Sequence, residues 1–345
     1  MQRFYYIDLL RALAIMMVFV AHSILSFGPA PWNFGFQFGG TGVELFFLLS
    51  GWLIGSQLYK EQQKFGSIDI KRFWFRRWMR TFPAYFAVLF FTLGQLYLTK
   101  ESVPNPTAYF FFLQNYLTDL PFFYVSWSLS VEEQFYLMIA PTLVLLSRSK
   151  SINFQFGILL LILLSPSLFR FMDLYTKSTQ THVRWDCCVM GVLLAFIHFK
   201  KPKLWANISK RAFAVCAICV CIYMSFYAFQ WFKPYTQYQG PSNLVLAFVF
   251  SGMLIFAIQK SVNKLPVCHA VIMHISTRSY SMYLLHPDAL AVCKKFFPIS
   301  NYFVFFTCSF IITMLASEIL YRVIELPFIG LREKYKFSAK RTRSC

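Results

Sequence analysis

Two ionisable side chains, Arg11 and His22, lie inside the first hydrophobic segment of the chain. Eleven residues at about 100° per residue amount to about three turns, so an α-helix places both side chains on one face. The rise between them is about 16 Å, roughly half the hydrocarbon thickness of a bilayer. Ionisable groups inside a membrane helix are costly and are functional candidates by default. The pair therefore predicts a polar functional site within the membrane.

Acidic residues are few, and those inside apolar segments need a cation or water as partner. Asp8 lies one turn before Arg11 on about the same face, so it could pair with Arg11 or merely neutralise it at the start of the helix. Glu44 opens the second apolar segment, directly after a glycine-rich run that permits a tight turn. In the same segment, small Ser50 and Gly51 permit close helix packing. Asp8, Glu44 and Ser50 are therefore expected to support the site.

Two adjacent carboxylates, Glu132 and Glu133, lie in the sequence WSLSVEEQFY at residues 127–136. Two neighbouring carboxylates on a spanning helix cannot both face lipid. At least one is therefore expected to turn inward toward a cation or water. The alternative is that this segment lies at the membrane interface and does not span.

Arginines are dense in the sequence KRFWFRRWMR at residues 71–80. Arg77 and Arg80 are three residues apart and share a helix face, with Arg72 and Arg76 nearby. Guanidinium groups bind phosphate in bidentate geometry, and the aromatic residues between them suit a helix along the inner leaflet. Two interpretations remain: a cytoplasmic site for a phosphate-rich ligand, or binding to anionic lipid headgroups.

The composition is typical of a polytopic membrane protein. Hydrophobic residues make up 57% of the chain, charged residues 14%, and the mean hydropathy is +0.52. Ten apolar segments approach the length needed to span a bilayer. They are Ile7–Phe27, Gly40–Leu58, Thr81–Leu98, Phe122–Leu146, Ser151–Phe169, Trp185–Phe199, Ala212–Phe232, Pro241–Gln259, Ile275–Val292 and Phe296–Ser317. The predicted fold is an all-α membrane helix bundle of about ten transmembrane helices.

Basic residues concentrate in alternate loops. Residues 60–80 hold seven basic and two acidic residues, and residues 200–211 hold five basic residues and no acid. By the positive-inside rule, both termini are predicted to be cytoplasmic. The formal net charge of +19 therefore reflects topology and does not indicate nucleic-acid binding. We expect one membrane domain at residues 1–331, a basic cytoplasmic tail at residues 332–345, and no cleaved signal peptide.

The sequence has no pattern typical of a metal or nucleotide site, such as HExxH, paired metal-ligand spacing or a glycine-rich loop. The cysteines lie mostly in apolar segments, where they serve as small hydrophobic residues. We therefore assign no metal.

Seven motifs follow one another between Ile7 and Phe328. They are residues 7–14 with His22, residues 46–51 (FFLLSG), the RxxR pattern of residues 77–80, residues 127–136, residues 184–195, residues 279–286 (SYSMYLLH) and residues 321–327 (YRVIELP). Taken together and in this order, they resemble the acyltransferase 3 family of integral membrane O-acyltransferases. Some members carry a further periplasmic hydrolase-like domain, which we do not expect after the membrane part here. Any second activity from such a domain is expected to be missing or to come from a separate periplasmic partner.

The resemblance implies transfer of an acyl group, usually acetyl from cytoplasmic acetyl-CoA, to a hydroxyl of an extracytoplasmic cell-envelope glycan such as O-antigen or exopolysaccharide. It also implies a multi-pass protein of the bacterial cytoplasmic (inner) membrane, with a glycan or glycolipid acceptor. In this scheme Arg72, Arg76, Arg77 and Arg80 hold coenzyme A. The alternative is a transporter or exporter of a glycan or lipid without acyl-transfer chemistry, for which inverted repeats would be the sign.

The expected catalytic residues are His22, Arg11 and Glu132. An imidazole has a reference pKa of about 6.5, so His22 could act as general base or carry the acetyl group itself. Arg11 could stabilise thiolate or oxyanion charge or hold the coenzyme arm, but at about 16 Å it is too far away to orient His22. Glu132 or Glu44 could orient the imidazole, and the sequence does not choose between them. Glu133 is expected to have a supporting role.

Overall fold

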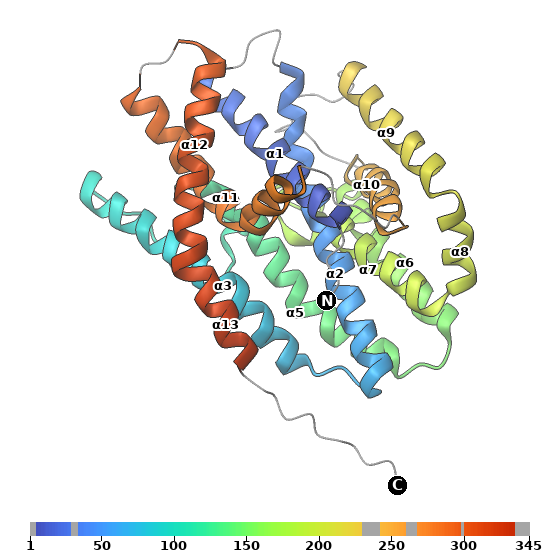
Figure 1. Cartoon of the computed structure of the whole chain (residues 1–345). Helices are drawn as coiled ribbons and strands as arrows, with labels where there is room; N and C mark the ends of the chain where they lie inside the picture. The colour runs from blue at the N-terminus through green and yellow to red at the C-terminus, as the bar shows by residue number, and fades with distance from the viewer. Residues whose placement is uncertain (1–4, 29–33, 230–241, 260–267, 298–299, 335–345) are drawn as a thin grey trace.

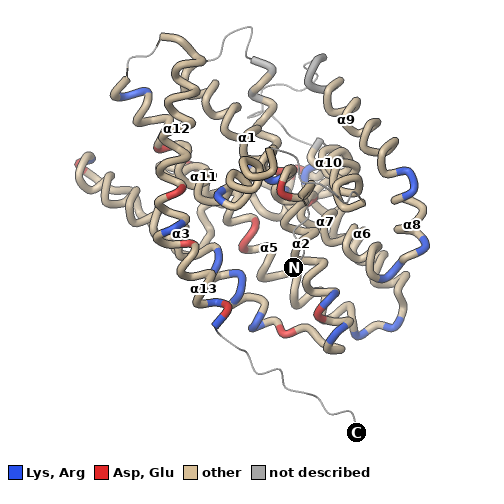
Figure 2. The backbone as a smooth tube through the Cα atoms, viewed as in Figure 1, with Lys and Arg blue, Asp and Glu red and all other residues tan. Residues whose placement is uncertain are grey.

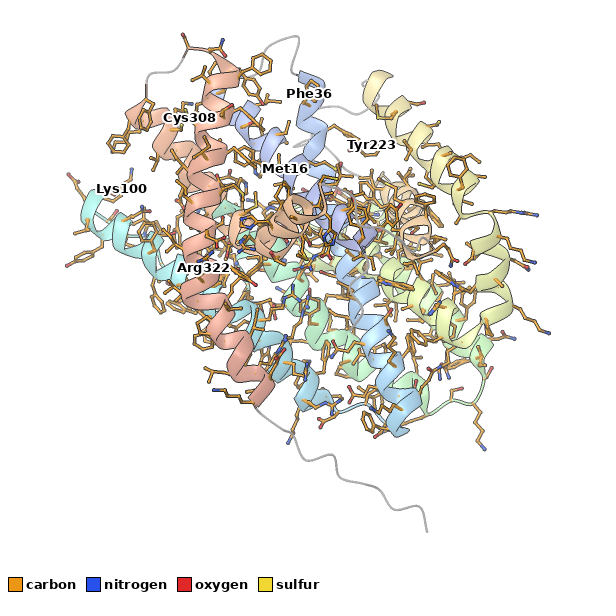
Figure 3. The ribbon with its side chains drawn as sticks, in the orientation of Figure 1. Met16, Phe36, Lys100, Tyr223, Cys308 and Arg322 are labelled. Carbon is orange, nitrogen blue, oxygen red and sulfur yellow. The ribbon has the colours of Figure 1, made fainter. Side chains whose placement is uncertain are left out.

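The computed structural model describes residues 5–28, 34–229, 242–259, 268–297 and 300–334, and these residues form helices and loops with no strand among them. The helices pack side by side in a bundle (Figure 1). Side chains fill the centre of this bundle, whereas Lys100 extends outward from the end of its helix (Figure 3). The predicted all-α class is confirmed for the described part of the chain.

The α-helices are α1 (Tyr5–Phe27), α2 (Gly42–Phe65), α3 (Ile70–Thr99), α4 (Thr107–Phe110), α5 (Trp127–Ser147), α6 (Ile152–Phe171), α7 (Asp186–Lys200), α8 (Pro202–Lys210), α9 (Ala212–Phe229), α10 (Ser242–Gln259), α11 (His269–Phe296), α12 (Tyr302–Leu320) and α13 (Leu326–Lys334). Short 3₁₀ turns are η1 (Phe34–Thr41), η2 (Gln114–Tyr116), η3 (Tyr124–Ser126) and η4 (Thr181–Val183). One π-helical turn, η6 (Tyr321–Glu325), joins α12 to α13. The domain boundary expected after residue 331 falls inside α13.

Six helical segments of the described chain are long and apolar enough to cross a membrane, or seven if the bent pair α8–α9 forms one span. This is fewer than the ten expected from the sequence. Two of the expected spans explain part of the difference. The helix at Trp185–Phe199 is α7, which has only 15 residues. The one at Ile275–Val292 lies in α11, whose buried side includes serines and a histidine.

The helices α2 and α7 are in backbone contact. A Cβ atom placed on Gly51 of α2 would lie 2.0 Å from the carbonyl oxygen of Cys188 in α7. A Cβ atom on Gly191 of α7 would lie 2.3 Å from the carbonyl oxygen of Leu48 in α2. Only glycine allows backbones to approach this closely, so the prediction of close packing at Gly51 is confirmed.

A buried ion pair fixes the start of α7. Nη1 of Arg170, at the end of α6, lies 2.9 Å from Oδ2 of Asp186, and the two side chains are 4% and 0% exposed. Arg170 also donates a hydrogen bond to the carbonyl oxygen of Val183 in η4. The pair therefore connects α6, η4 and α7.

We expect Asp186→Ala to destabilise the protein by about 3–5 kcal/mol, because it leaves the buried Arg170 guanidinium without its counter-ion. The measurement is thermal unfolding of the purified protein in detergent. Asp119→Ala is the matched control, since this carboxylate is 95% exposed and its pair with Lys177 is worth little. Equal unfolding temperatures for the two variants would contradict this role of the Arg170 pair.

An arginine chamber and a histidine pair

A pocket inside the bundle lies where α1, α2, α3, α5 and α11 meet. Its charged lining residues are Arg11, Arg77, Arg80 and Glu132. Among the residues that line the pocket itself, three guanidinium groups face one carboxylate, so this lining is positively charged and suits an anionic ligand. We call this pocket the arginine chamber.

Helix α5 holds Arg77 in place. The guanidinium donates a hydrogen bond to the Tyr136 hydroxyl and lies over the same ring, 4.3 Å from its centroid. Trp74, one turn earlier in α3, donates to the backbone carbonyl of Tyr136 over 3.2 Å. Nε of Arg77 is buried and has no partner among the described residues. Arg77 is therefore firmly positioned while one of its N–H groups stays available.

Arg11 and Arg80 line the chamber without a hydrogen bond or ion pair to any other residue that the structure describes. The pairing considered for Asp8 and Arg11 is absent from the same residues, because the Asp8 carboxylate instead accepts a hydrogen bond from Ser276 over 2.6 Å. Ser276 lies on α11, which packs along α1. Arg11 is thus left facing the chamber.

Both carboxylates of α5 turn into the bundle. Glu132 lines the chamber and accepts a hydrogen bond from Ser50 of α2 over 2.5 Å. Glu133 is buried and accepts a hydrogen bond from Thr81 of α3 over 2.8 Å. The expectation that at least one of them turns inward is confirmed. The adjacent positions reach different helices because their side chains diverge by about 100°.

His22 is bonded to a second histidine. Nδ1 of His22 lies 2.7 Å from Nε2 of His286, and the planes of the two rings are within 5° of parallel, with centroids 5.0 Å apart. His286 is fully buried, whereas His22 is half-buried. The ring of Tyr124 in η3 packs edge-on against His22 with centroids 5.7 Å apart.

The neighbours of His286 fix the tautomers of both rings. Nδ1 of His286 lies 2.9 Å from the carbonyl oxygen of Tyr283, which can only accept, so this nitrogen is the donor. A neutral imidazole has one N–H, so Nε2 of His286 accepts the proton of His22 Nδ1. Nε2 of His22 then carries a lone pair, and it has no hydrogen-bond partner among the described residues. This is the arrangement that a general base requires.

The idea that Glu132 or Glu44 orients His22 is wrong in this structure, where His286 holds that position. Glu132 is bonded to Ser50, and Glu44 forms a buried ion pair with Arg184 over 2.6 Å. The sequence alone did not single out His286, which precedes Pro287, a residue type that often kinks or ends a helix. Helix α11 instead continues through Pro287 to Phe296. The available signal was the SYSMYLLH motif, which ends at His286.

His22 is not among the residues that line the arginine chamber. Tyr283 separates the two, since it lines the chamber and its ring lies 5.8 Å from that of His286. The hydroxyl of Tyr283 lies 2.6 Å from that of Ser128, which also lines the chamber. The polar site predicted for Arg11 and His22 together is therefore divided, with the Tyr283 side chain between the chamber and the histidine pair.

A second missed residue is Glu325, at the end of the π-helical turn η6. It is buried, accepts a hydrogen bond from Ser281, and interacts electrostatically with Arg11 and Arg80. Single π-helical turns occur often at functional sites. The YRVIELP motif contained this glutamate, but nothing in its spacing showed that it would approach Arg11 and Arg80.

The other two expected phosphate ligands lie outside the lining of the chamber. Arg72 forms an ion pair with Glu61 over 3.3 Å, and its backbone N–H is capped by Asp69 at the start of α3. Arg76 lies one turn before Arg80 and has no ion pair among the described residues. Among these residues there is also no cluster of three or more His, Cys, Asp or Glu that could hold a metal.

The bundle and its site define a multi-pass membrane protein with a basic chamber beside an imidazole pair. Residues 4–322 match the acyltransferase domain family (Acyl_transf_3), and the chain belongs to this family.

Two curated relatives illustrate the similarity. The O-acetyltransferase OatA of Staphylococcus aureus strain NCTC 8325 / PS 47 is 27% identical over 361 residues, which cover 93% of this chain and 56% of that protein. "Putative O-acetyltransferase SACOL0978" of Staphylococcus aureus strain COL is 27% identical over 365 residues, with 93% and 56% covered. The chain thus spans about half the length of these relatives. No solved structure matches the chain significantly.

Proposed function

We propose that this protein is a membrane O-acetyltransferase that moves an acetyl group from cytoplasmic acetyl-CoA to a hydroxyl of a cell-envelope glycan or glycolipid. The observation that carries the proposal is the lone pair of His22 Nε2, set by the bond to His286 and adjacent to the arginine chamber. The names of the relatives support acetyl transfer to oxygen. The positive charge of the chamber supports a donor that carries phosphate groups.

In the proposed reaction, Nε2 of His22 takes the proton of the acceptor hydroxyl as its oxygen attacks the thioester carbonyl. The new C–O bond forms, the C–S bond breaks, and the imidazolium returns its proton to the coenzyme A thiolate. Arg11 lines the chamber with Arg77 and Arg80, about 16 Å along α1 from His22, so it holds the coenzyme A arm that leads to the thioester. Arg77 and Arg80 hold phosphate groups, and Glu132 offsets part of the positive charge of the chamber. Asp8, Ser50 and Glu133 fix the helices around them.

We further propose that both termini face the cytoplasm of a bacterium, that the protein resides in its inner membrane, and that residues 1–331 act as one membrane domain. Most Lys and Arg residues gather toward one end of the bundle, where α2 and α13 end and α3 begins (Figure 2). This distribution supports the orientation given by the positive-inside rule. It also supports entry of acetyl-CoA from that end.

The test uses the purified protein in proteoliposomes with radiolabelled acetyl-CoA and a cell-envelope glycan extract. We expect label in the glycan fraction as an ester that mild alkali releases, whereas an amide would survive this treatment. Boiled protein is the control. Absence of label from the glycan contradicts the proposal, and glycan export without labelling is the result expected of a transporter.

A further inference from the structure

Helix α13 lies beside the first half of α3 at the lower end of the bundle in Figure 1. Arg332 follows Glu325 by seven residues, which is about two turns, so both occupy one face of the helix. Arg76 precedes Arg80 by one turn on α3. Glu325 interacts electrostatically with Arg80, and Arg332 with Arg76. The two helices thus carry two successive levels of charge: Glu325 with Arg80, and below them Arg332 with Arg76.

Among the described residues, the lower level has only the exposed carboxylate of Glu333 as a compensating acid. The side chain of Arg332 is only 17% exposed, and its Nε is buried without a partner among the described residues. Its ion pair is a loose one of 3.6 Å to Glu333, a carboxylate that is itself 69% exposed. Arg332 also interacts electrostatically with two like charges, Arg76 and Arg77.

The rest of the chain cannot supply the missing acid. All 14 Asp and Glu residues belong to the described part, so the remaining segments contain only neutral and basic side chains. Three guanidinium groups brought together at the surface of a helix pair repel one another unless an anion binds between them. A phosphomonoester is such an anion: it carries about two negative charges at neutral pH and accepts bidentate hydrogen bonds from arginine.

We propose that Arg332 and Arg76 bind the 3′-phosphate of the coenzyme A nucleotide, which makes Arg332 a specificity-determining residue for the donor. This inference rests on the proposed function, because it takes coenzyme A as the donor. The 3′-phosphate is a phosphomonoester on the ribose, at the end of the coenzyme far from the thiol. Arg77 and Arg80 line the chamber itself and therefore meet the pyrophosphate and the arm that leads to the thioester.

The experiment compares binding of coenzyme A and of dephospho-coenzyme A, which differ only in the 3′-phosphate. Binding is measured by isothermal titration calorimetry on the full chain in phosphatidylcholine nanodiscs, which offer no anionic headgroups. We expect the unaltered protein to bind coenzyme A about 10- to 100-fold more tightly than dephospho-coenzyme A, as fits charge-assisted hydrogen bonds to a phosphate. In Arg332→Ala this ratio should fall to about 1, with the affinity for dephospho-coenzyme A unchanged.

Three further variants separate binding from folding. Lys334→Ala removes an exposed cation from the same helix and should keep the full ratio. Arg332→Lys keeps the charge but loses the planar fork, so an intermediate ratio is expected. Arg76→Gln tests the site from α3, and should also lower the ratio. Unchanged affinity for dephospho-coenzyme A serves as the folding control for each variant.

The outcomes distinguish this inference from the proposed function. If neither compound binds the unaltered protein, coenzyme A is not the ligand and the donor itself is wrong. If both bind and Arg332→Ala keeps the ratio of the unaltered protein, the donor stands and the 3′-phosphate site is overturned. If a variant changes the binding ratio only in nanodiscs that contain phosphatidylglycerol, the two arginines bind a lipid headgroup. This result also overturns the 3′-phosphate site.

Discussion

Replacing His22 with alanine is expected to lower the turnover of acetyl transfer by about 10² to 10⁴, the range that general-base catalysis contributes. The amount of membrane-inserted protein should stay unchanged, because a half-buried imidazole with one side-chain hydrogen bond adds little to the packing of α1. The measurement is kcat with acetyl-CoA and the glycan extract. Turnover equal to that of the unaltered protein would remove His22 from the mechanism.

His286 acts through His22, so it is a positioning residue. His286→Ala should lower kcat by about 10- to 100-fold with KM for acetyl-CoA unchanged, the same cost as losing a group that orients a metal-bound histidine. His286→Gln offers a carbonyl oxygen that can accept the His22 Nδ1 proton, and should restore part of kcat. The double variant His22→Ala/His286→Ala should be no slower than His22→Ala alone, because residues that act as a unit are not additive.

His269→Ala is the matched control for both histidines. It removes an imidazole from the start of the same helix, α11. The His269 ring packs against Tyr5 and lies more than four helical turns before His286. Its turnover should equal that of the unaltered protein. A loss comparable to that of His286→Ala would mean that the effect comes from destabilising α11 and not from orienting His22.

Predictions from the sequence were correct where the residue type alone determines whether a side chain is buried or helices pack closely. A charged side chain in an apolar segment must turn inward, so Arg11 and at least one of Glu132 and Glu133 could be assigned to the interior before their partners were known. Gly51 beside Ser50 indicated close packing for the same reason, because only a small residue permits it. These inferences need no knowledge of which helices are neighbours.

Partnerships between distant segments could not be predicted in the same way. His22 and His286 are 264 residues apart, and only the packing of α11 along α1 brings them together. Asp8 meets Ser276 and not Arg11, although helical spacing alone favours the nearer cation. Glu325 interacts electrostatically with Arg11 and Arg80 and ends a π-helical turn, which inserts an extra residue and changes the face on which later residues lie. One sequence does not contain this information in a local pattern.

Gly51→Ala is expected to lower the free energy of unfolding by about 3 kcal/mol or more, the upper end of the usual cost of overpacking. The new Cβ would lie 2.0 Å from the carbonyl oxygen of Cys188, and its next neighbours are also backbone atoms of that residue. A backbone atom cannot rotate away as a side chain can. Helix α7 cannot shift either, since its residues 186–197 are all buried. The measurement is thermal unfolding of the purified protein in detergent.

Gly94→Ala is the matched control, because a Cβ atom at this position in α3 has no neighbour within 4 Å. Alanine is the better helix former there, so its unfolding temperature should be equal or slightly higher. The fraction of Gly51→Ala that does fold should also transfer acetyl more slowly. Any outward shift of α2 moves Ser50 away from Glu132, to which it is bonded across the wall of the chamber. Normal stability together with normal turnover would mean that α2 and α7 adapt without cost, and that their close contact does not position the chamber.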